Sequence, residues 1–189
     1  MSKKMLLIID PQNDFINGSL AVEGADGAML SLARHIERHG TEYDVIAVTC
    51  DWHPVNHISF KDNGGIWPPH CVQHTNGACI SPIIFDAIRS LENAHYVTFT
   101  KGDNPKTEEY SFMDNKESAN KFLQLVKDEE ITEIDCCGNA LNYCVSESII
   151  GMWAKGLGDK ITLLTKFSPA IGDATKVLED LASKGIKIL

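Results

Sequence analysis

The sequence lacks several features that would assign it to a specialised class of protein. It contains no run of about 18 apolar residues, which argues against a transmembrane helix. An excess of positive charge is also missing, because the 189 residues carry a net charge of −9, whereas a general nucleic-acid binder presents a basic patch. We therefore expect neither a membrane nor a nucleic acid among its partners.

Two further absences concern the cellular location. The apolar stretch near the N-terminus reaches Asp10 after only a few residues, which is too short for the core of a signal peptide. The six cysteines include no C-x-x-C pair, and without a secretion signal we interpret them as reduced thiols. Both absences favour the cytoplasm. The chain length favours a single domain over residues 1–189.

Short apolar runs rich in Val, Ile and Thr alternate with amphipathic stretches. The predicted strands span 4–10, 43–50, 95–101, 133–139, 160–166 and 185–189, and the predicted helices span 27–40, 115–130, 142–158 and 173–185. Runs that are apolar on both faces suit buried parallel strands, and strand–helix alternation places helices on both faces of the sheet. The sequence therefore predicts an α/β fold with a doubly wound, six-stranded, mostly parallel sheet.

Residues 51–80 interrupt this alternation. The segment is rich in Pro, Gly, Asn and His, and it is too long for an idle connection within a compact domain. Loops of this length are often functional. We therefore expect the segment to contribute to a ligand site.

Four reactive side chains lie at the ends of predicted strands. Asp10 ends the first strand, Asp51 ends the second, Lys101 ends the third, and Cys144 comes soon after the fourth. The ligand site of an open α/β sheet lies outside the carboxyl ends of its strands, so we expect these side chains to face one crevice. A carboxylate, an ammonium and a thiol together suit nucleophilic catalysis. The sequence thus predicts Asp10, Lys101 and Cys144 as catalytic residues.

Three cysteines follow one another closely, and two of them have a simpler interpretation. Cys136 and Cys137 lie inside an apolar strand, where a free cysteine packs as a small hydrophobic residue. Cys144 lies beyond Gly138, which ends that strand, and Asn142 is placed to cap the next helix. We therefore expect Cys144 in the first helical turn, where the helix dipole favours a thiolate.

The histidine-rich segment contains candidate metal ligands. Asp51, His53 and His70 combine carboxylate with imidazole, a set that suits Zn, Fe, Ni or Mn better than Ca or Mg. Three protein ligands leave positions open for water or substrate. His57 has two interpretations, as a fourth ligand or as a hydrogen-bonding partner of the ligands.

Five stretches resemble the motifs of a known family. They are LLIIDPQNDF, DWHPVNHISF, WPPHCVQ, FTKG and GNALNYCV, and they occur in the order and spacing of that family, from Leu6 to beyond Cys144. The chain resembles the nicotinamidases (pyrazinamidases), within the isochorismatase-like cysteine hydrolases. The histidine-containing motifs are the specific part, because metal-free relatives in the superfamily lack them. The implied fold is the isochorismatase-like hydrolase fold.

The resemblance implies roles for individual residues. It implies a triad of Asp10, Lys101 and Cys144, and one divalent transition metal per chain held by Asp51, His53 and His70, with zinc in first place and iron or manganese as alternatives. It implies a pocket lined by Phe15, Trp67, Tyr110 and Tyr143, and a cis peptide at Asn139–Ala140 that helps to build the oxyanion site. Such proteins are often homo-oligomers.

The implied activity is the hydrolysis of nicotinamide, and also of pyrazinamide, to the acid and ammonia through a thioester. The chain departs from the family at one place. Ala140-Leu141-Asn142 stands where the family usually has Ala-Thr-Asp, and Asn139 replaces an aliphatic residue. A polar Asn139 facing the substrate would leave the amide specificity open.

Three other functions compete with this one. A related amidase of the same fold could act on another small amide or on a carbamoyl substrate. Carbamoyl and ureido substrates, however, lack a ring nitrogen that could coordinate the metal. A non-catalytic metal or redox module would not need Asp10 or Lys101 at neighbouring strand ends. A pure interaction protein would leave all the strand-end residues unexplained.

Overall fold

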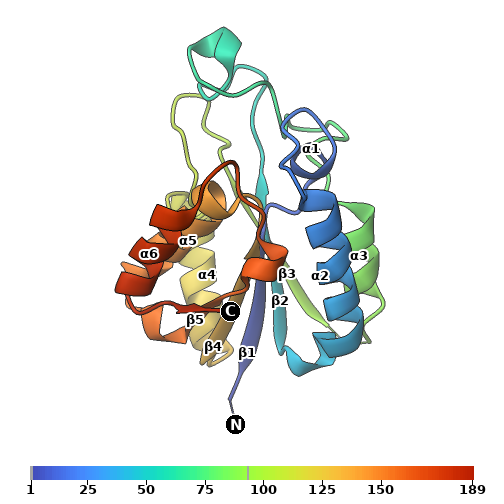
Figure 1. Ribbon diagram of the computed structural model, residues 1–189, viewed down its shortest axis with the longest axis vertical. Coiled ribbons are helices and arrows are strands. Elements are labelled where there is room, and N and C mark those ends of the chain that lie inside the picture. The colour runs from blue at the N-terminus through green and yellow to red at the C-terminus, as the bar shows by residue number, and fades with distance from the viewer. Residues whose placement is uncertain (1, 93) are drawn as a thin grey trace.

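A six-stranded sheet forms the centre of the molecule (Figure 1). The computed structural model describes residues 2–92 and 94–189. The strands lie in the order β3-β2-β1-β4-β5-β6, and each neighbouring pair is parallel. Their bounds are Lys4–Ile9 (β1), Val45–Asp51 (β2), His95–Lys101 (β3), Glu133–Gly138 (β4), Ile161–Leu163 (β5) and Lys187–Ile188 (β6). The predicted doubly wound parallel sheet is confirmed.

Helices cover both faces of the sheet, as the alternating pattern predicts (Figure 1). One face carries α2 (Ala25–His39) and α3 (Pro82–Arg89), and the other carries α4 (Lys116–Asp128), α5 (Ser146–Trp153) and α6 (Thr175–Ser183). The remaining helical segments are α1 (Asn13–Ile16), the 3-10 turns η1 (Gly40–Glu42), η2 (Lys61–Asn63), η4 (Gly158–Lys160) and η5 (Thr165–Phe167), and the wider turn η3 (Leu141–Val145). No described helix is long and apolar enough to cross a membrane.

The predicted elements differ most from the observed ones at α3, at the start of α5 and at the end of β5. Helix α3 is not predicted from the sequence, because its eight residues are too few for a clear period and follow an irregular segment. The helix predicted over 142–158 begins only at Ser146, since η3 precedes it. Strand β5 ends at Leu163, three residues early, because the chain turns into η5.

The core consists of two apolar layers, one on each side of the sheet. Leu7 and Cys136 are partners across β1 and β4, and both belong to the layer under α4, α5 and α6. Ile8 and Cys137, the next pair in register, belong to the layer under α2 and α3. All four side chains are fully buried. The interpretation of Cys136 and Cys137 as packing residues is confirmed.

The strand order fixes where a ligand site can form. From β1 the chain builds outward through β2 to β3, and it then returns to β4 and builds the other half through β5 and β6. The two halves diverge at the β1–β4 pair, and the crevice at such a switch point opens at the carboxyl ends of the strands. Residues 52–80 extend beyond this edge of the sheet, at the top of Figure 1.

Candidate active site

The Lys101 side chain lies at the carboxyl edge of the sheet and is fully buried. Its Nζ lies 2.9 Å from Asp10 Oδ2 and 3.3 Å from Cys144 Sγ, and it donates a hydrogen bond to Asp51 Oδ1. Asp51 reaches this position because it is the register partner of Lys101 across β2 and β3. The structure thus brings together all four strand-end side chains.

The charges of this group depend on one another. Burial alone would lower the pKa of Lys101, but Asp10 and Asp51 outweigh burial and raise it well above the usual 10.5. Burial alone would raise the pKa of Asp51, but Lys101 and His53 hold it well below its usual range. For Asp10 burial is only partly offset by Lys101, so the pKa is raised above 3.8. Asp10 is therefore the more basic of the two carboxylates.

The two oxygens of the Asp10 carboxylate have different partners. Thr49 Oγ1 donates to Asp10 Oδ1 at 2.6 Å, and the Asp10 backbone N–H donates to the Thr49 carbonyl at 3.1 Å. Oδ2 faces Lys101, and within the described residues it accepts no well-aligned hydrogen bond. Asn139 is fully buried, and its Nδ2 donates to the Asp10 carbonyl at 3.3 Å. Asn139 therefore contacts the backbone of Asp10 and does not line the cavity.

Cys144 lies in η3, ahead of α5, and not in the first turn of that helix. Asn142 does not cap the helix, because its side chain bonds to Ile171 instead. Burial raises the pKa of the Cys144 thiol well above 9.0, since Asp10 adds to burial and Lys101 only partly opposes both. These surroundings favour the thiol, in contrast to the helix end predicted from the sequence, which would favour a thiolate. The sulfur keeps its proton until a base removes it.

The peptide bond between Asn139 and Ala140 is cis, as the family resemblance implies. The Ala140 carbonyl accepts hydrogen bonds from the N–H groups of Tyr143 and Val145, at 3.1 and 3.2 Å, which holds the turn that carries Cys144. Ala140 also lines the cavity. Among the described residues its own N–H has no acceptor, so this donor is available to a substrate oxygen.

A candidate metal centre adjoins Lys101. One ligand atom each from Asp51, His53 and His70 lies within 4.8 Å of the others, and all three residues are buried. His53 Nδ1 bonds to the Gly102 carbonyl at 2.9 Å, and His70 Nδ1 bonds to the Pro68 carbonyl at 2.8 Å. Each Nδ1 therefore carries the proton, and each Nε2 presents its lone pair near Asp51 Oδ2, at 3.6 and 3.9 Å. This donor set fits a divalent transition metal.

His57 lies beside this centre, but its nitrogens point elsewhere. Its ring packs against His53, with 4.1 Å between the ring centroids. Nδ1 is 2.7 Å from Ser59 Oγ, and Nε2 is 3.1 Å from the Thr107 carbonyl. With both nitrogens engaged, His57 fits the second interpretation, in which it supports a ligand through its contacts.

Hydrogen bonds from Glu109 through Gly102 hold the His53 ring in place, and neither residue was predicted from the sequence. The buried Glu109 carboxylate accepts a hydrogen bond from the Gly102 N–H at 2.8 Å, and the Gly102 carbonyl accepts from His53. Gly102 has φ of 69°, and a Cβ there would lie 2.4 Å from His53 Cε1. Only glycine leaves room for the imidazole. FTKG places this glycine next to Lys101, which is a usable signal in the sequence.

Gly102→Ala is expected to weaken metal binding about 10- to 100-fold, because the added methyl group displaces the His53 ring. A chelator-competition titration measures the effect. Gly64→Ala is the matched control: Gly64 also has a positive φ, of 97°, but no atom lies within 4 Å of its Cβ position. Equal metal affinity in the two variants would contradict the role given to Gly102.

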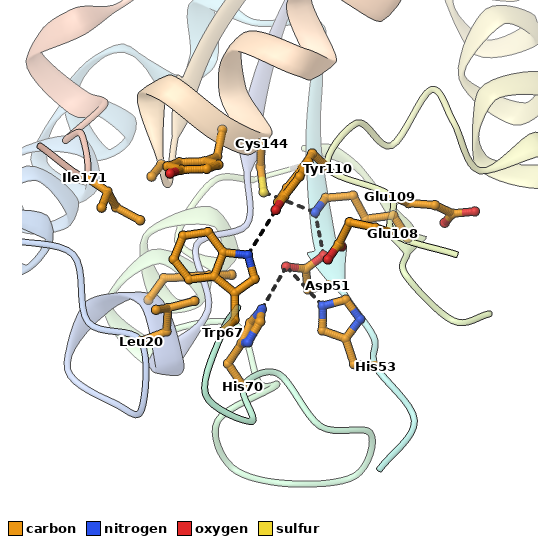
Figure 2. Close-up of a pocket in the computed structure, with 14 residues that line it drawn as sticks. Leu20, Asp51, His53, Trp67, His70, Glu108, Glu109, Tyr110, Cys144 and Ile171 are labelled. Atoms are coloured by element: carbon orange, nitrogen blue, oxygen red, sulfur yellow. Dashed lines mark hydrogen bonds and ion pairs between the residues drawn. The ribbon is translucent and has the colours of Figure 1, made fainter. Parts of the chain in front are cut away.

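Aromatic side chains line a cavity beside Cys144, with an empty volume of about 360 Å³ that includes space open to solvent (Figure 2). Trp67 Nε1 donates to the Tyr110 hydroxyl at 3.0 Å, and the Trp67 ring meets Tyr143 edge to face, with 5.1 Å between centroids. Phe15 also lines the cavity. All four pocket residues implied by the resemblance therefore face the same space.

Four further cavity residues were not predicted from the sequence. They are Leu20, Glu108, Glu109 and Ile171. In Figure 2 Leu20 and Ile171 lie across the cavity from Glu108 and Glu109, so one side is apolar and the other acidic. The two glutamates directly precede Tyr110, which is a signal that could have found them. Leu20 and Ile171 belong to irregular segments without a motif.

The parallel sheet is that of the isochorismatase-like hydrolase fold, and a thiol, a carboxylate and an ammonium lie at its switch point. Comparison with models of protein families finds no match. A curated relative, the nicotinamidase of Escherichia coli, is 32% identical over 87% of this chain and 82% of its own length. The chain belongs to the nicotinamidase family.

Solved structures agree with this assignment. The pyrazinamidase of Pyrococcus horikoshii, in complex with zinc, is 29% identical, with a TM-score of 0.85 over 99% of this chain and 98% of its own. A protein from L. infantum in complex with nicotinate is also 29% identical, with a TM-score of 0.85 over 100% of this chain and 92% of its own.

Proposed function

We propose that the chain hydrolyses nicotinamide to nicotinate and ammonia. The observation that carries this proposal is the buried contact of Lys101 with both Asp10 and Cys144, at the edge of an aromatic cavity. The relatives named nicotinamidase and the neighbour with bound nicotinate support the choice of a pyridine carboxamide. Pyrazinamide has the same carboxamide on a similar ring, so it is the expected second substrate.

The first half of the reaction forms a thioester. Asp10 takes the proton from the Cys144 thiol, for which its raised pKa suits it, and an oxygen of Asp10 lies within 4.8 Å of the sulfur. The sulfur attacks the carboxamide carbon while the Lys101 ammonium stabilises the negative charge near the thiolate. Asp10 then passes the proton to the leaving nitrogen, which departs as ammonia.

The second half returns the enzyme to its starting state. Asp10 removes a proton from water, the hydroxide attacks the thioester carbon, and the sulfur leaves and recovers its proton as nicotinate departs. In both halves the carbonyl oxygen becomes negative. The N–H groups of Ala140 and Cys144 are the proposed donors to it, and one such donor contributes roughly 2.7–4 kcal/mol in other enzymes.

Asp51, His53 and His70 would hold one divalent metal, with zinc in first place and iron or manganese as alternatives. When bound, the metal would supply a Lewis acid for the pyridine nitrogen, which orients the ring. Phe15 and Trp67 are the proposed partners of the ring faces. The zinc complex of the Pyrococcus pyrazinamidase supports zinc as the first metal to test.

The purified protein is expected to release one ammonia for each nicotinamide consumed, which a coupled ammonia assay measures. A panel of nicotinamide, pyrazinamide, a simple aliphatic amide and a carbamoyl amino acid tests the specificity. Preferred hydrolysis of the carbamoyl compound would replace the proposed function by the related amidase activity. Elemental analysis of protein purified without chelator tests the metal, and the absence of any transition metal would remove that part of the proposal.

A further inference from the structure

Asn142 links the turn that carries the nucleophile to a distant segment. Its Nδ2 donates to the Ile171 carbonyl at 2.8 Å, and its Oδ1 accepts from the Ile171 N–H at 2.9 Å. The neighbouring Leu141 N–H donates to the Pro169 carbonyl at 2.8 Å. The N–H and the carbonyl of Ile171 are therefore both hydrogen-bonded to the same side chain.

Ile171 forms part of the apolar side of the cavity. It lines the cavity together with Leu20, and it packs in the same cluster as Ala140 and Tyr143 (Figure 2). The segment between η5 and α6 that contains Ile171 has no regular helix or strand of its own. Its position therefore depends on contacts such as those from Asn142.

The pairing needs a primary amide. An aspartate of the same shape could accept from the Ile171 N–H, but it cannot donate to the carbonyl and would place a charged oxygen against it. An aliphatic residue could do neither. A helix cap, which is the role that the sequence alone predicts for Asn142, needs only a side-chain acceptor and not both a donor and an acceptor.

We propose that Asn142 is a positioning residue, which holds Ile171 as the apolar wall of the substrate cavity and thereby sets the affinity for the ring of the substrate. This inference rests on the proposed function for the identity of that substrate. Asn142 touches neither the reacting atoms nor the metal group; its effect passes through Ile171.

The test compares Asn142→Ala and Asn142→Asp with the unaltered protein in nicotinamide hydrolysis. Both variants are expected to raise KM several-fold, up to about tenfold, with kcat changed less than about twofold, because a typical hydrogen bond contributes modestly. The aspartate variant matters most, since it conserves size. If the role of Asn142 were only to fill space, this variant would keep the KM of the unaltered protein.

A double-mutant cycle shows whether the effect passes through Ile171. In an Ile171→Ala background the wall is already lost, so Asn142→Ala is expected to add little to KM. The same fold-change in both backgrounds would overturn the proposal. Thr175→Ala is the matched control, because it removes a 2.6 Å hydrogen bond to Asp173 where the same segment enters α6, and neither residue lines the cavity. It is expected to leave KM unchanged.

Hydrogen exchange provides a measurement that needs no substrate. The Ile171 amide is expected to exchange faster in Asn142→Ala, because its acceptor is gone, while the Leu141 amide keeps its bond to Pro169. Unchanged exchange at Ile171 would contradict the link itself. A protein that fails to hydrolyse nicotinamide but shows the faster exchange would overturn the proposed function and leave the Asn142–Ile171 link standing.

Discussion

Cys144→Ala is expected to abolish the hydrolysis of nicotinamide, lowering kcat by at least about 10⁴-fold. Alanine has no nucleophilic atom, and no other cysteine contacts Lys101 within the described chain. The aromatic cavity stays in place, so the variant is still expected to bind nicotinamide. Steady-state ammonia release measures the first effect, and a binding titration measures the second.

Cys136→Ala and Cys137→Ala are the matched controls for this variant. Both thiols are as completely buried as any side chain in the protein, yet they face the apolar layers of the core. Each substitution is expected to lower the free energy of unfolding by roughly 1 kcal/mol, through a small cavity, and to leave kcat near its original value. If Cys144→Ala retained its turnover, or if either control lost it, Cys144 would not be the nucleophile.

Asp10→Asn is expected to lower kcat by about 10²- to 10⁴-fold, the range that a general base contributes. The amide has nearly the shape of the carboxylate and keeps an oxygen for Thr49, but it cannot take the thiol proton. The loss is large because the Cys144 thiol has a raised pKa and does not ionise by itself at neutral pH. Asp135→Asn makes the same substitution in a carboxylate that bonds to Tyr43 and Lys4, away from the cavity, and is expected to retain activity.

The pH dependence of the reaction checks the same assignment. A base must be unprotonated, so kcat/KM is expected to fall as the pH drops through the pKa of Asp10. Burial raises this pKa above 3.8, which moves the acid limb of the profile to a pH above the ordinary aspartate range. The residual activity of Asp10→Asn is expected to lack this limb. An identical acid limb in the variant would assign it to another group.

The strand ends are the part of the site that the sequence predicts best. Buried parallel strands are recognisable in the sequence as apolar runs, and the chain direction alone decides which end of each strand is the carboxyl end. Asp10, Asp51 and Lys101 therefore could be placed together before any contact was known. The cavity residues Phe15, Trp67, Tyr110 and Tyr143 came from the family resemblance instead, since no local pattern points to them.

The structure differs most from the predictions in the irregular segments. Asn142 follows a strand and precedes a helix, which is the usual place for a cap, but its amide pairs with Ile171 instead. Asn139 was expected near the substrate and lies buried against Asp10. In both cases the partner lies about 30 residues or more away, and a local pattern carries no information about it.

The helix end predicted around Cys144 also differs from the structure, for a related reason. Helix position is a local property, but the protonation of a thiol depends on everything that surrounds it. Burial and the Asp10 carboxylate outweigh the Lys101 ammonium here, and η3 moves the cysteine away from the start of α5.

The sequence by itself determined the order of the six strands and of the longer helices along the chain, the chemistry at the strand ends and the residue types of the candidate metal ligands, because these depend on local periodicity and residue chemistry. Only the tertiary structure decided which oxygen of Asp10 faces Lys101, which nitrogens of His53 and His70 face Asp51, and what holds Ile171 in the cavity wall. Each of these depends on the direction of a side chain. That direction is set by hydrogen bonds between segments that meet only when the sheet has formed.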